Sequence, residues 1–509
     1  MEKIKMKRKL ILWVGLAVLI IILLAAFLIF DHCYTVFNGN VVSRNEEHIV
    51  LENTEESDIS DITQFNAPVL IDLRSVGASA EDVAFLQEKF PECRILWTVN
   101  VSEGFSLENE AEVAVLADST QLESFVAAAD NLGNVKKIKV DYPNLSKRHY
   151  DDLAAAFPAA EIEYSVVIKE KEVPIESEKL DFSAFTYEEI IEAAELIEML
   201  PKLSEIELMD AEGNSAFTLD EVIAIHECYP EVKLNYSFEL YGQSVSTSTE
   251  RIEYYKEEIG DEGLELFRKV LPMMHGLKYL RFHECGTSDE AVAQLREDFP
   301  EVKIVWLLEF GHVKFYTDTI RLRADFWLTP ELVYKLKYCV DVKYIDCGHL
   351  YSVSDVEWVR YMPNLEVCIV AISRLKDLTP FEDCKNLEFL EVFSTDVTDL
   401  SPLAGCENLE YLNISNLFIN DISAIMGLNK LKMVNCNMNR QVPQEQIDEF
   451  RRLHPDTIFT YYRNYGPTET GWRFDKSGFY TERYLLLRQQ MGYDEVNMSP
   501  VGYIPAPIE

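Results

Sequence analysis

The sequence has little cysteine for its length, no closely spaced cysteine pair and a shortage of basic residues. Ten cysteines occur in 509 residues and none forms a C-x-x-C pair, which excludes a zinc ribbon and a thioredoxin-like motif. Lys and Arg number 47 against 87 Asp and Glu, so the net charge is −40. A chain this acidic repels phosphate backbones, and we therefore expect no nucleic-acid partner.

The motifs of the common catalytic and cofactor sites are also missing. The sequence contains no H-E-x-x-H, G-x-S-x-G or P-loop pattern, so we predict a protein that is not an enzyme and holds no cofactor. Two His-Glu-Cys tripeptides begin at His226 and His283, but their cysteines fall at different places in the surrounding repeats. We expect no metal site there.

One long uncharged stretch lies near the N-terminus. Residues 10–30 contain no charged side chain, and at about 1.5 Å per residue a helix of this length crosses the hydrocarbon core of a bilayer. The alternative, a cleaved signal peptide, has a shorter apolar stretch and a small-x-small cleavage site. Residues 1–9 are basic and the residues after the stretch are acidic. The positive-inside rule then predicts a single-pass anchor in the cell membrane, with a cytoplasmic N-terminus and the bulk of the chain outside.

The region after this anchor is rich in acids. Between Glu46 and Asp61 there are seven acidic residues and no Lys or Arg. Such a run is typical of a solvated, poorly ordered segment. We therefore predict an acidic linker over residues 31–66.

Internal repeats indicate the fold. Leucine recurs every 22 residues from Leu365 to Leu431, and further apolar residues recur at positions 4, 6, 11, 14 and 17 counted from each leucine. This L-x-x-L-x-L pattern predicts leucine-rich repeats over residues 329–463, the short-period coils, in which each unit adds one short strand to a stack. Position 9 usually carries an asparagine that bonds to the backbone, and among these units only Asn439 provides it.

A longer repeat occupies residues 67–328, the long-period units. Its marker is an aromatic residue followed by proline, at successive spacings of 67, 72 and 70 residues. Apolar residues three apart precede each proline, as in a helix, and apolar residues two apart follow it, as in a strand. We also expect an extra hairpin after the copies. The marker prolines are Pro91, Pro158, Pro230 and Pro300.

Together the two repeats predict an α/β fold. We expect a leucine-rich-repeat solenoid over residues 67–463, with helical convex segments and hairpin excursions, preceded by one transmembrane helix. Residues 464–509, which are rich in aromatic side chains, are expected to cap the last coil. Cys384 and Cys406 fall in the same column of adjacent coils, and we expect them to be reduced packing residues rather than a disulfide.

Four short segments carry a resemblance to a known family. They are Phe-Pro-Glu-Val-Lys-Ile-Val-Trp at residues 299–306, Tyr-Thr-Asp at 316–318, Asp-Leu-Ser-Pro-Leu at 399–403 and Pro-Thr-Glu-Thr-Gly-Trp-Arg at 467–473. In these segments the chain resembles envelope leucine-rich-repeat proteins of Gram-positive, often gut-dwelling bacteria, related in their repeats to internalins. The resemblance implies a surface protein that binds something, with another protein as the expected ligand.

The strands of the short-period coils predict a candidate binding face. Position 3 is expected to point out of the concave side as an aromatic stripe bordered by carboxylates. Aromatic residues and Met are enriched at the centres of protein interfaces, so we predict that a protein or peptide binds there. The alternative is that these side chains pack on one another or lie under the C-terminal tail. The candidate residues are Tyr344, Glu388, Phe389, Glu391, Phe393, Glu410, Tyr411, Asn413 and Met433.

Protein recognition at the cell surface is thus the leading functional interpretation. Two alternatives stay open at this point. The chain could be a structural, stalk-like envelope protein without a specific ligand, or an accessory to cell-wall enzymes.

Overall fold

The computed structural model describes residues 2–52, 58–311, 313–324, 328–351 and 354–493, with side chains from residue 12 onward. The contacts within the chain divide it into two compact units, Met1–Leu234 and Asn235–Glu509.

The N-terminal unit begins with a long helix. α1 (Glu2–Cys33) contains the whole predicted apolar stretch, and its side chains from residue 12 to residue 32 are exposed. Among the described helices it is the one that is long and apolar enough to cross a membrane, over Leu12–Cys33. A signal sequence near an N-terminus can also form a helix that is long and apolar enough by these criteria.

The prediction of a poorly ordered linker over residues 31–66 is wrong for the part of it that the structure describes. β1 (Tyr34–Phe37) and β2 (Asn40–Ser43) form a hairpin directly after α1, and β3 (His48–Val50) begins a parallel sheet. Apolar residues stand among the acids and directly after them, and their burial orders the segment although its charge favours solvation. The buried residues are Ile49, Leu51, Ile62 and Phe65.

Three sheets of mainly parallel strands follow in this unit, in the strand orders β3-β4-β5, β11-β10-β9-β8 and β12-β13-β14. Their further strands are β4 (Leu70–Asp72), β5 (Arg94–Leu96), β8 (Val113–Leu116), β9 (Lys137–Pro143), β10 (Glu161–Ile168), β11 (Lys171–Val173), β12 (Lys179–Asp181), β13 (Glu205–Glu207) and β14 (Lys233–Asn235). The short helices beside them are α3 (Leu122–Ala127), α5 (Tyr187–Glu192) and α6 (Ala194–Ile197).

The aromatic-Pro copies fold as predicted. Each helix starts at a Ser or Thr whose side chain accepts a backbone N–H of the first turn, and ends where the aromatic residue donates its N–H to the carbonyl four residues back. The following proline prevents another turn. These helices are α2 (Ala80–Lys89), α4 (Lys147–Ala156), α7 (Leu219–Cys228) and, in the second unit, α9 (Asp289–Asp298).

The expected hairpins are present after these copies. Each is an antiparallel pair that follows the strand of the copy or extends it. Besides β10–β11, they are β6 (Thr98–Ser102) with β7 (Phe105–Glu108), β15 (Ser237–Leu240) with β16 (Gln243–Ser246), and β19 (Lys303–Phe310) with β20 (Val313–Tyr316).

The second unit contains two larger sheets. The first has the order β17-β18-β19-β20, with β17 (Arg251–Tyr255) and β18 (Tyr279–His283) separated by α8 (Gly260–Val270). The second has seven strands, all parallel, in the order of the sequence. They are β21 (Arg321–Arg323), β22 (Tyr344–Asp346), β23 (Val367–Ile369), β24 (Phe389–Glu391), β25 (Tyr411–Asn413), β26 (Met433–Asn435) and β27 (Ile458–Thr460).

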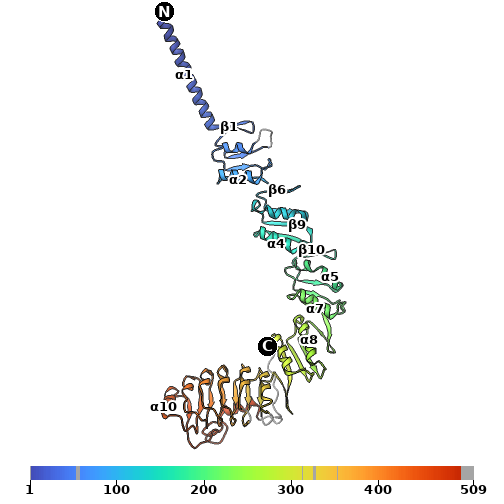
Figure 1. Cartoon of the computed structure of the whole chain (residues 1–509), viewed down its shortest axis with the longest axis vertical. Coiled ribbons are helices and arrows are strands. Elements are labelled where there is room, and N and C mark those ends of the chain that lie inside the picture. Colours follow the sequence, from blue (N-terminus) through green and yellow to red (C-terminus); the bar gives the residue numbers. More distant parts are fainter. Residues whose placement is uncertain (1, 53–57, 312, 325–327, 352–353, 494–509) are drawn as a thin grey trace. The chain divides into compact units, whose positions relative to one another are not determined.

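The seven-stranded sheet confirms the register predicted for the short-period coils. Phe389 pairs with Tyr411 and Leu390 with Leu412, and both leucines are 0% exposed. One 3₁₀ helix per coil returns the chain to the next strand, and α10 (Gln444–Leu453) lies at the end of the stack (Figure 1). At the turn after each of the strands β22–β26 one residue has φ between 54° and 66°; these residues are His349, Ile372, Ser394, Asn416 and Met438.

The prediction of one continuous solenoid over residues 67–463 needs correction. The short-period coils share a single parallel sheet, which also includes β21 at the end of the long-period region, whereas the other strands of the long-period units lie in separate smaller sheets. The hairpins explain part of this difference. β11 and β20 occupy an edge of their sheets antiparallel to the neighbouring strand, and this ends the parallel order there.

Candidate functional site

The candidate face is formed by neighbouring strands β22–β26. Parallel pairing in register places the position-3 residues in one row, as the sequence predicts. Within this row the rings of Phe389 and Tyr411 have their centroids 6.2 Å apart.

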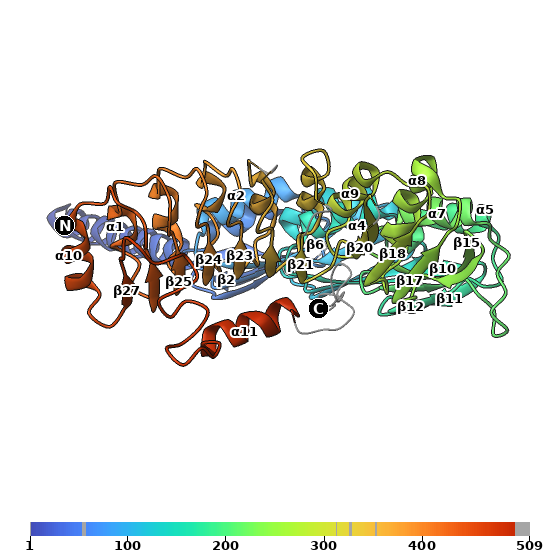
Figure 2. The same cartoon turned by 90° about the horizontal axis from the view of Figure 1, so that it is seen from below.

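The chain's own C-terminal part covers this row. Residues 466–493, the tail segment, include α11 (Glu482–Met491), which lies along the sheet (Figure 2). Trp472, Tyr484, Leu487 and Met491 of the tail segment pack in one buried cluster with position-3 residues and their neighbours. The face residues of that cluster are Val367, Ile369, Ala371, Phe389, Phe393 and Met433.

The predicted exposed aromatic stripe is therefore wrong, because the tail segment removes it from solvent. Phe389, Phe393 and Met433 are only 2%, 3% and 7% exposed. Tyr344 and Tyr411 are half-buried against the same cluster. The expectation that the tail caps the end of the last coil is also corrected for residues 466–493, which lie on the concave face instead. Residues 494–509 of that expected cap lie outside the described residues.

Two polar face residues lie beneath the tail segment. Glu391 is 1% exposed; it accepts a hydrogen bond from the indole Nε1–H of Trp472, and its Oε2 lies 3.8 Å from Nη2 of Arg473. Burial raises the pKa of Glu391 to about 7 although Arg473 and the indole oppose the rise. Asn413 is 0% exposed and donates from Nδ2 to the carbonyl of Pro467 at 2.9 Å.

The two remaining carboxylates lie at the border of the covered area. Glu388 is exposed, and Glu410 forms an ion pair with Lys432 at 2.7 Å. Between them, the guanidinium of Arg483 from α11 lies 4.6 Å from the ring centroid of Phe389 and 5.2 Å from that of Tyr411. Cation–π contacts of this kind hold a cation on an aromatic surface.

The sequence alternative that the C-terminal tail covers these side chains is the one that the structure shows. Sequence reasoning did not name Asn435, which also donates to the Pro467 carbonyl at 2.8 Å. A signal was present in the tail. Tyr484, Leu487 and Met491 have the spacing of one helix face, and Thr481 before them is a favourable N-cap residue. What the sequence does not contain is the partner of that apolar helix face.

Two hollows flank the tail segment. One of about 430 Å³ lies between α11 and the Phe389–Tyr411–Met433 row. The other, of about 380 Å³, is lined by Asp346, Glu391 and the arginines Arg323, Arg473 and Arg488. α11 therefore fills only part of the concave face.

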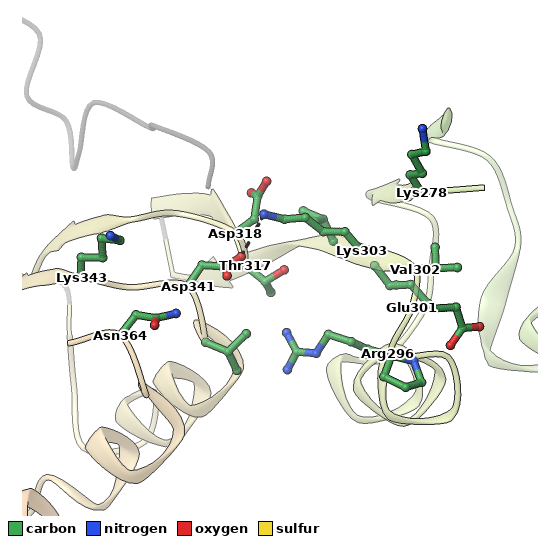
Figure 3. Close-up of a pocket in the computed structure, with 14 residues that line it drawn as sticks. Lys278, Arg296, Glu301, Val302, Lys303, Thr317, Asp318, Asp341, Lys343 and Asn364 are labelled. Atoms are coloured by element: carbon green, nitrogen blue, oxygen red, sulfur yellow. Dashed lines mark ion pairs between the residues drawn. The ribbon is translucent and has the colours of Figure 1, made fainter. Parts of the chain in front are cut away.

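A third hollow, of about 560 Å³, lies between α9 with β19 and the first short-period coil (Figure 3). Arg296 reaches into it from α9, donates to the Tyr338 carbonyl at 3.0 Å and lies 4.8 Å from the Trp306 ring centroid. Lys303 forms an ion pair with Asp341 at 3.2 Å. Four basic and three acidic side chains line this hollow. These internal pairs support a role in joining α9 and β19 to the first coil.

The cysteine and histidine positions add no site. Cys384 and Cys406 are free and buried, in agreement with reduced packing residues. His226 lies on α7 and His283 at the end of β18. In the part of the chain that the structure describes, no three His, Cys, Asp or Glu side chains gather as metal ligands would.

The repeat period, the parallel sheet and the buried leucine columns together define a leucine-rich-repeat fold. No protein-family model and no curated protein matches the chain.

Among solved structures the chain is similar to internalin C2 of Listeria monocytogenes, at 16% identity and a TM-score of 0.24 over 45% of this chain and 81% of that one. It is also similar to a second internalin of that species, at 12% identity and a TM-score of 0.23 over 83% of this chain and 85% of that one. A leucine-rich-repeat protein of Leptospira interrogans is similar at 12% identity and a TM-score of 0.25, over 65% of this chain and 91% of that one. At these values the likeness carries no argument, and the fold assignment stands on the chain's own repeats and sheet.

Proposed function

We propose that this chain is a single-pass membrane protein whose short-period coils recognise another polypeptide at the cell surface, without catalysing a reaction. One observation carries the proposal: the concave face already holds a polypeptide segment, with Trp472 and Leu487 as buried anchors. A surface that orders a helix of its own chain has the shape and chemistry to bind one from another protein.

Two features support the membrane part of the proposal. α1 is apolar along Leu12–Cys33, and the basic residues 1–9 precede this stretch, which favours a cytoplasmic N-terminus. The hairpin β1–β2 follows α1 directly, and Arg44 joins the two elements by donating from Nε to the carbonyl of Asp31 at 2.8 Å. The resemblance of the repeats favours the envelope of a Gram-positive, gut-dwelling bacterium.

Capture of a partner tests recognition. The full chain carrying Trp472→Ala/Leu487→Ala, which weakens the hold of the tail segment on the face, is mixed in detergent micelles with envelope and host extracts and should retain a protein in saturable, near-stoichiometric amount. The double change Phe389→Ala/Glu391→Gln should reduce this capture, since central interface anchors contribute about 2 kcal/mol or more each. Phe418→Ala is the matched control, because Phe418 is also an aromatic residue of these coils but its side chain is 62% exposed. Equal capture by both variants would remove the concave face from the proposal.

Protease accessibility tests the topology. Protease added to intact protoplasts should remove the repeats and leave a small membrane-bound fragment that contains α1. Recovery of a soluble mature protein that starts near residue 31 would instead identify α1 as a cleaved signal sequence.

One observation favours a second candidate function. The concave face is covered, so a structural envelope protein without an external ligand would also explain the packed tail segment. In that case the extracts should yield no saturable partner, and the variant and control chains should behave alike.

A further inference from the structure

We propose that the tail segment is an exchangeable internal ligand, and that the concave face accepts in its place a basic amphipathic helix presented by a partner protein. The proposal rests on the proposed function, because it names the kind of polypeptide that the coils recognise. Three features of the covered face carry it, and they concern its polarity, its packing and its charge.

The first feature is the polarity of the buried contact. Glu391 and Asn413 lie at the centre of the covered area, at 1% and 0% exposure, and hydrogen bond to the tail segment. Asn437 adds a bond from Nδ2 to the hydroxyl of Thr470 at 3.0 Å. Ionisable side chains are rarely buried in a permanent core. On an open concave face these groups would be hydrated, so the face is suited to both a covered and an uncovered state.

The second feature is incomplete packing. Hollows of about 430 Å³ and 380 Å³ lie on the two sides of the tail segment. Both hollows are open to solvent, so the tail segment leaves parts of the face on either side of it uncovered. A helix with such hollows on both sides is held by a limited set of anchors, here Trp472, Tyr484, Leu487 and Met491. Another helix with similar anchors can therefore occupy the same strands.

The third feature is charge complementarity. The face contributes Glu391 at its centre and Glu388 and Glu410 at its border, whereas the tail segment contributes Arg473 toward Glu391 and Arg483 over the aromatic row. The resident ligand thus combines buried apolar residues of α11 and Trp472 before it with arginines that meet carboxylates and rings. A partner helix that competes with it needs the same pattern.

Tethering explains why the internal ligand occupies the face in the isolated chain. A segment joined to its own binding site acts at an effective concentration in the millimolar range for short flexible connections. A free helix with the same contacts then binds poorly to the wild-type chain. Weakening the anchors of the tail segment should make the face available without altering the strands that form it.

A synthetic peptide of residues 466–493, labelled with fluorescein, serves as the probe, and the receptor is the full chain in detergent micelles. The tail variant Trp472→Ala/Leu487→Ala should bind this peptide at least about tenfold more tightly than the wild type does. Leu485→Ala/Leu486→Ala is the control, because these α11 residues are 52% and 47% exposed; it should bind the peptide as weakly as the wild type. Adding Phe389→Ala to the tail variant should remove binding again.

A second binding experiment tests the charge pattern. A peptide in which Arg473 and Arg483 are replaced by Gln should bind the tail variant more weakly than the native peptide, and the difference should shrink at high salt. Equal binding of the two peptides would overturn the requirement for a basic helix.

Hydrogen exchange of the wild-type chain keeps the proposal testable even where a variant misfolds. Amides of residues 466–493 should open with a lower free energy than those of β23–β26, as an exchangeable segment requires. Tail amides that open only with the sheet would overturn the proposal, as would peptide binding that does not improve in a correctly folded tail variant.

The outcomes also separate this inference from the proposed function. A captured protein that the 466–493 peptide cannot displace would leave recognition standing and overturn the exchange. Peptide binding to the tail variant without any captured protein would support the exchange at this face and count against recognition of an external partner.

Discussion

The short-period coils and the long-period units use the same kind of strand but organise it differently. In the coils, the strands β22–β27 join β21 in one parallel sheet, and a short return leads from each strand to the next. In the long-period units, helices and hairpins stand between the strands, and the sheets have two to four strands. A constant short repeat lets every coil pair with the next in the same parallel register. An added hairpin instead places an antiparallel strand at the edge of a sheet, and the parallel pairing ends there.

The two regions share one link at the turns, since Asn144 and Lys256 of the long-period units also have positive φ and donate their N–H to the next segment, at Ser165 and His283. They differ in what is added to this link. In the short-period coils the residue with positive φ donates its N–H to the next coil, as Ile372 does to Phe393 and Asn416 to Asn437. Asn439 joins two coils by donating to the Ile414 carbonyl and accepting from the Leu417 N–H. The long-period units rely more on capped helices, each stabilised within its own repeat. The difference predicts that damage spreads along the coils but stays local in the long-period units.

Core truncation should give the largest effect. Leu390→Ala removes a side chain that is 0% exposed in β24 and should lower the free energy of unfolding by about 2–5 kcal/mol. Leu280→Ala in β18 is the matched change, since Leu280 is also 0% exposed. Hydrogen exchange should show protection lost over several coils for Leu390→Ala and over β17–β20 alone for Leu280→Ala. Loss confined to β24 and its direct neighbours would contradict the spreading.

The covered face should make the coils respond to pH. Glu391 has a pKa of about 7 beneath the tail segment against 4.5 for the ordinary side chain, so the folded state binds a proton more tightly than the unfolded state. The resulting stability is complete below pH 4.5 and is lost as the pH rises through 7. A shift of this size corresponds to about 3 kcal/mol. The charged and titratable groups that face this carboxyl are Asp346, Arg473, Arg483, Tyr484 and Tyr493.

Melting curves between pH 5.5 and pH 8 test this dependence. Glu391→Gln keeps an acceptor for the Trp472 indole and cannot titrate, so its stability should fall less than that of the wild type over this range. Glu388→Gln is the control, because Glu388 is exposed at the border of the same face. Identical pH profiles for wild type and Glu391→Gln would show that this carboxyl does not couple to folding.

Loss of the inter-coil asparagine should have an intermediate effect. Asn439→Ala leaves a buried carbonyl and a buried N–H without their partner, which costs about 1–3 kcal/mol. Thr395→Ala removes one hydroxyl bond to Val392 within the same coil and should cost about 0.5–1.5 kcal/mol. Chemical denaturation of the two variants gives the comparison. A larger loss for Thr395→Ala would mean that bonds between coils matter less than bonds within them.

Helix caps should give the smallest effect, confined to the long-period units. Thr218→Ala removes the cap of α7, where Thr218 accepts the N–H of Glu221, and should cost about 0.5–2 kcal/mol. Protection of α7 amides should fall while the β21–β27 amides stay unchanged. Thr218→Ser keeps the hydroxyl, so the α7 amides of this variant should be protected as in the wild type.

Much of the fold could be predicted from residue spacing alone. The leucine column fixed the register of Leu390 and Leu412, and the aromatic-Pro pairs located α2, α4, α7 and α9, because burial of a repeated apolar face is a local requirement. The acidic region after α1 was predicted less well. Its charges were counted, but Ile62 and Phe65 directly after the acids are buried, and this burial orders the segment while Glu46, Glu47 and Asp58 stay exposed.

The residues that form the candidate site could be predicted, but whether they are exposed to solvent could not. Spacing determined that Phe389, Tyr411 and Met433 stand in one row of a parallel sheet, and it determined the long apolar helix at the N-terminus. Whether that row meets solvent was decided by the tertiary structure, because the groups that cover it come from far along the chain. The hydrogen bond from Trp472 to Glu391 spans 81 residues of sequence. Periodicity assigns a side chain to a face of its strand, whereas its exposure depends on which distant segment gains most by burying its own apolar side against that face.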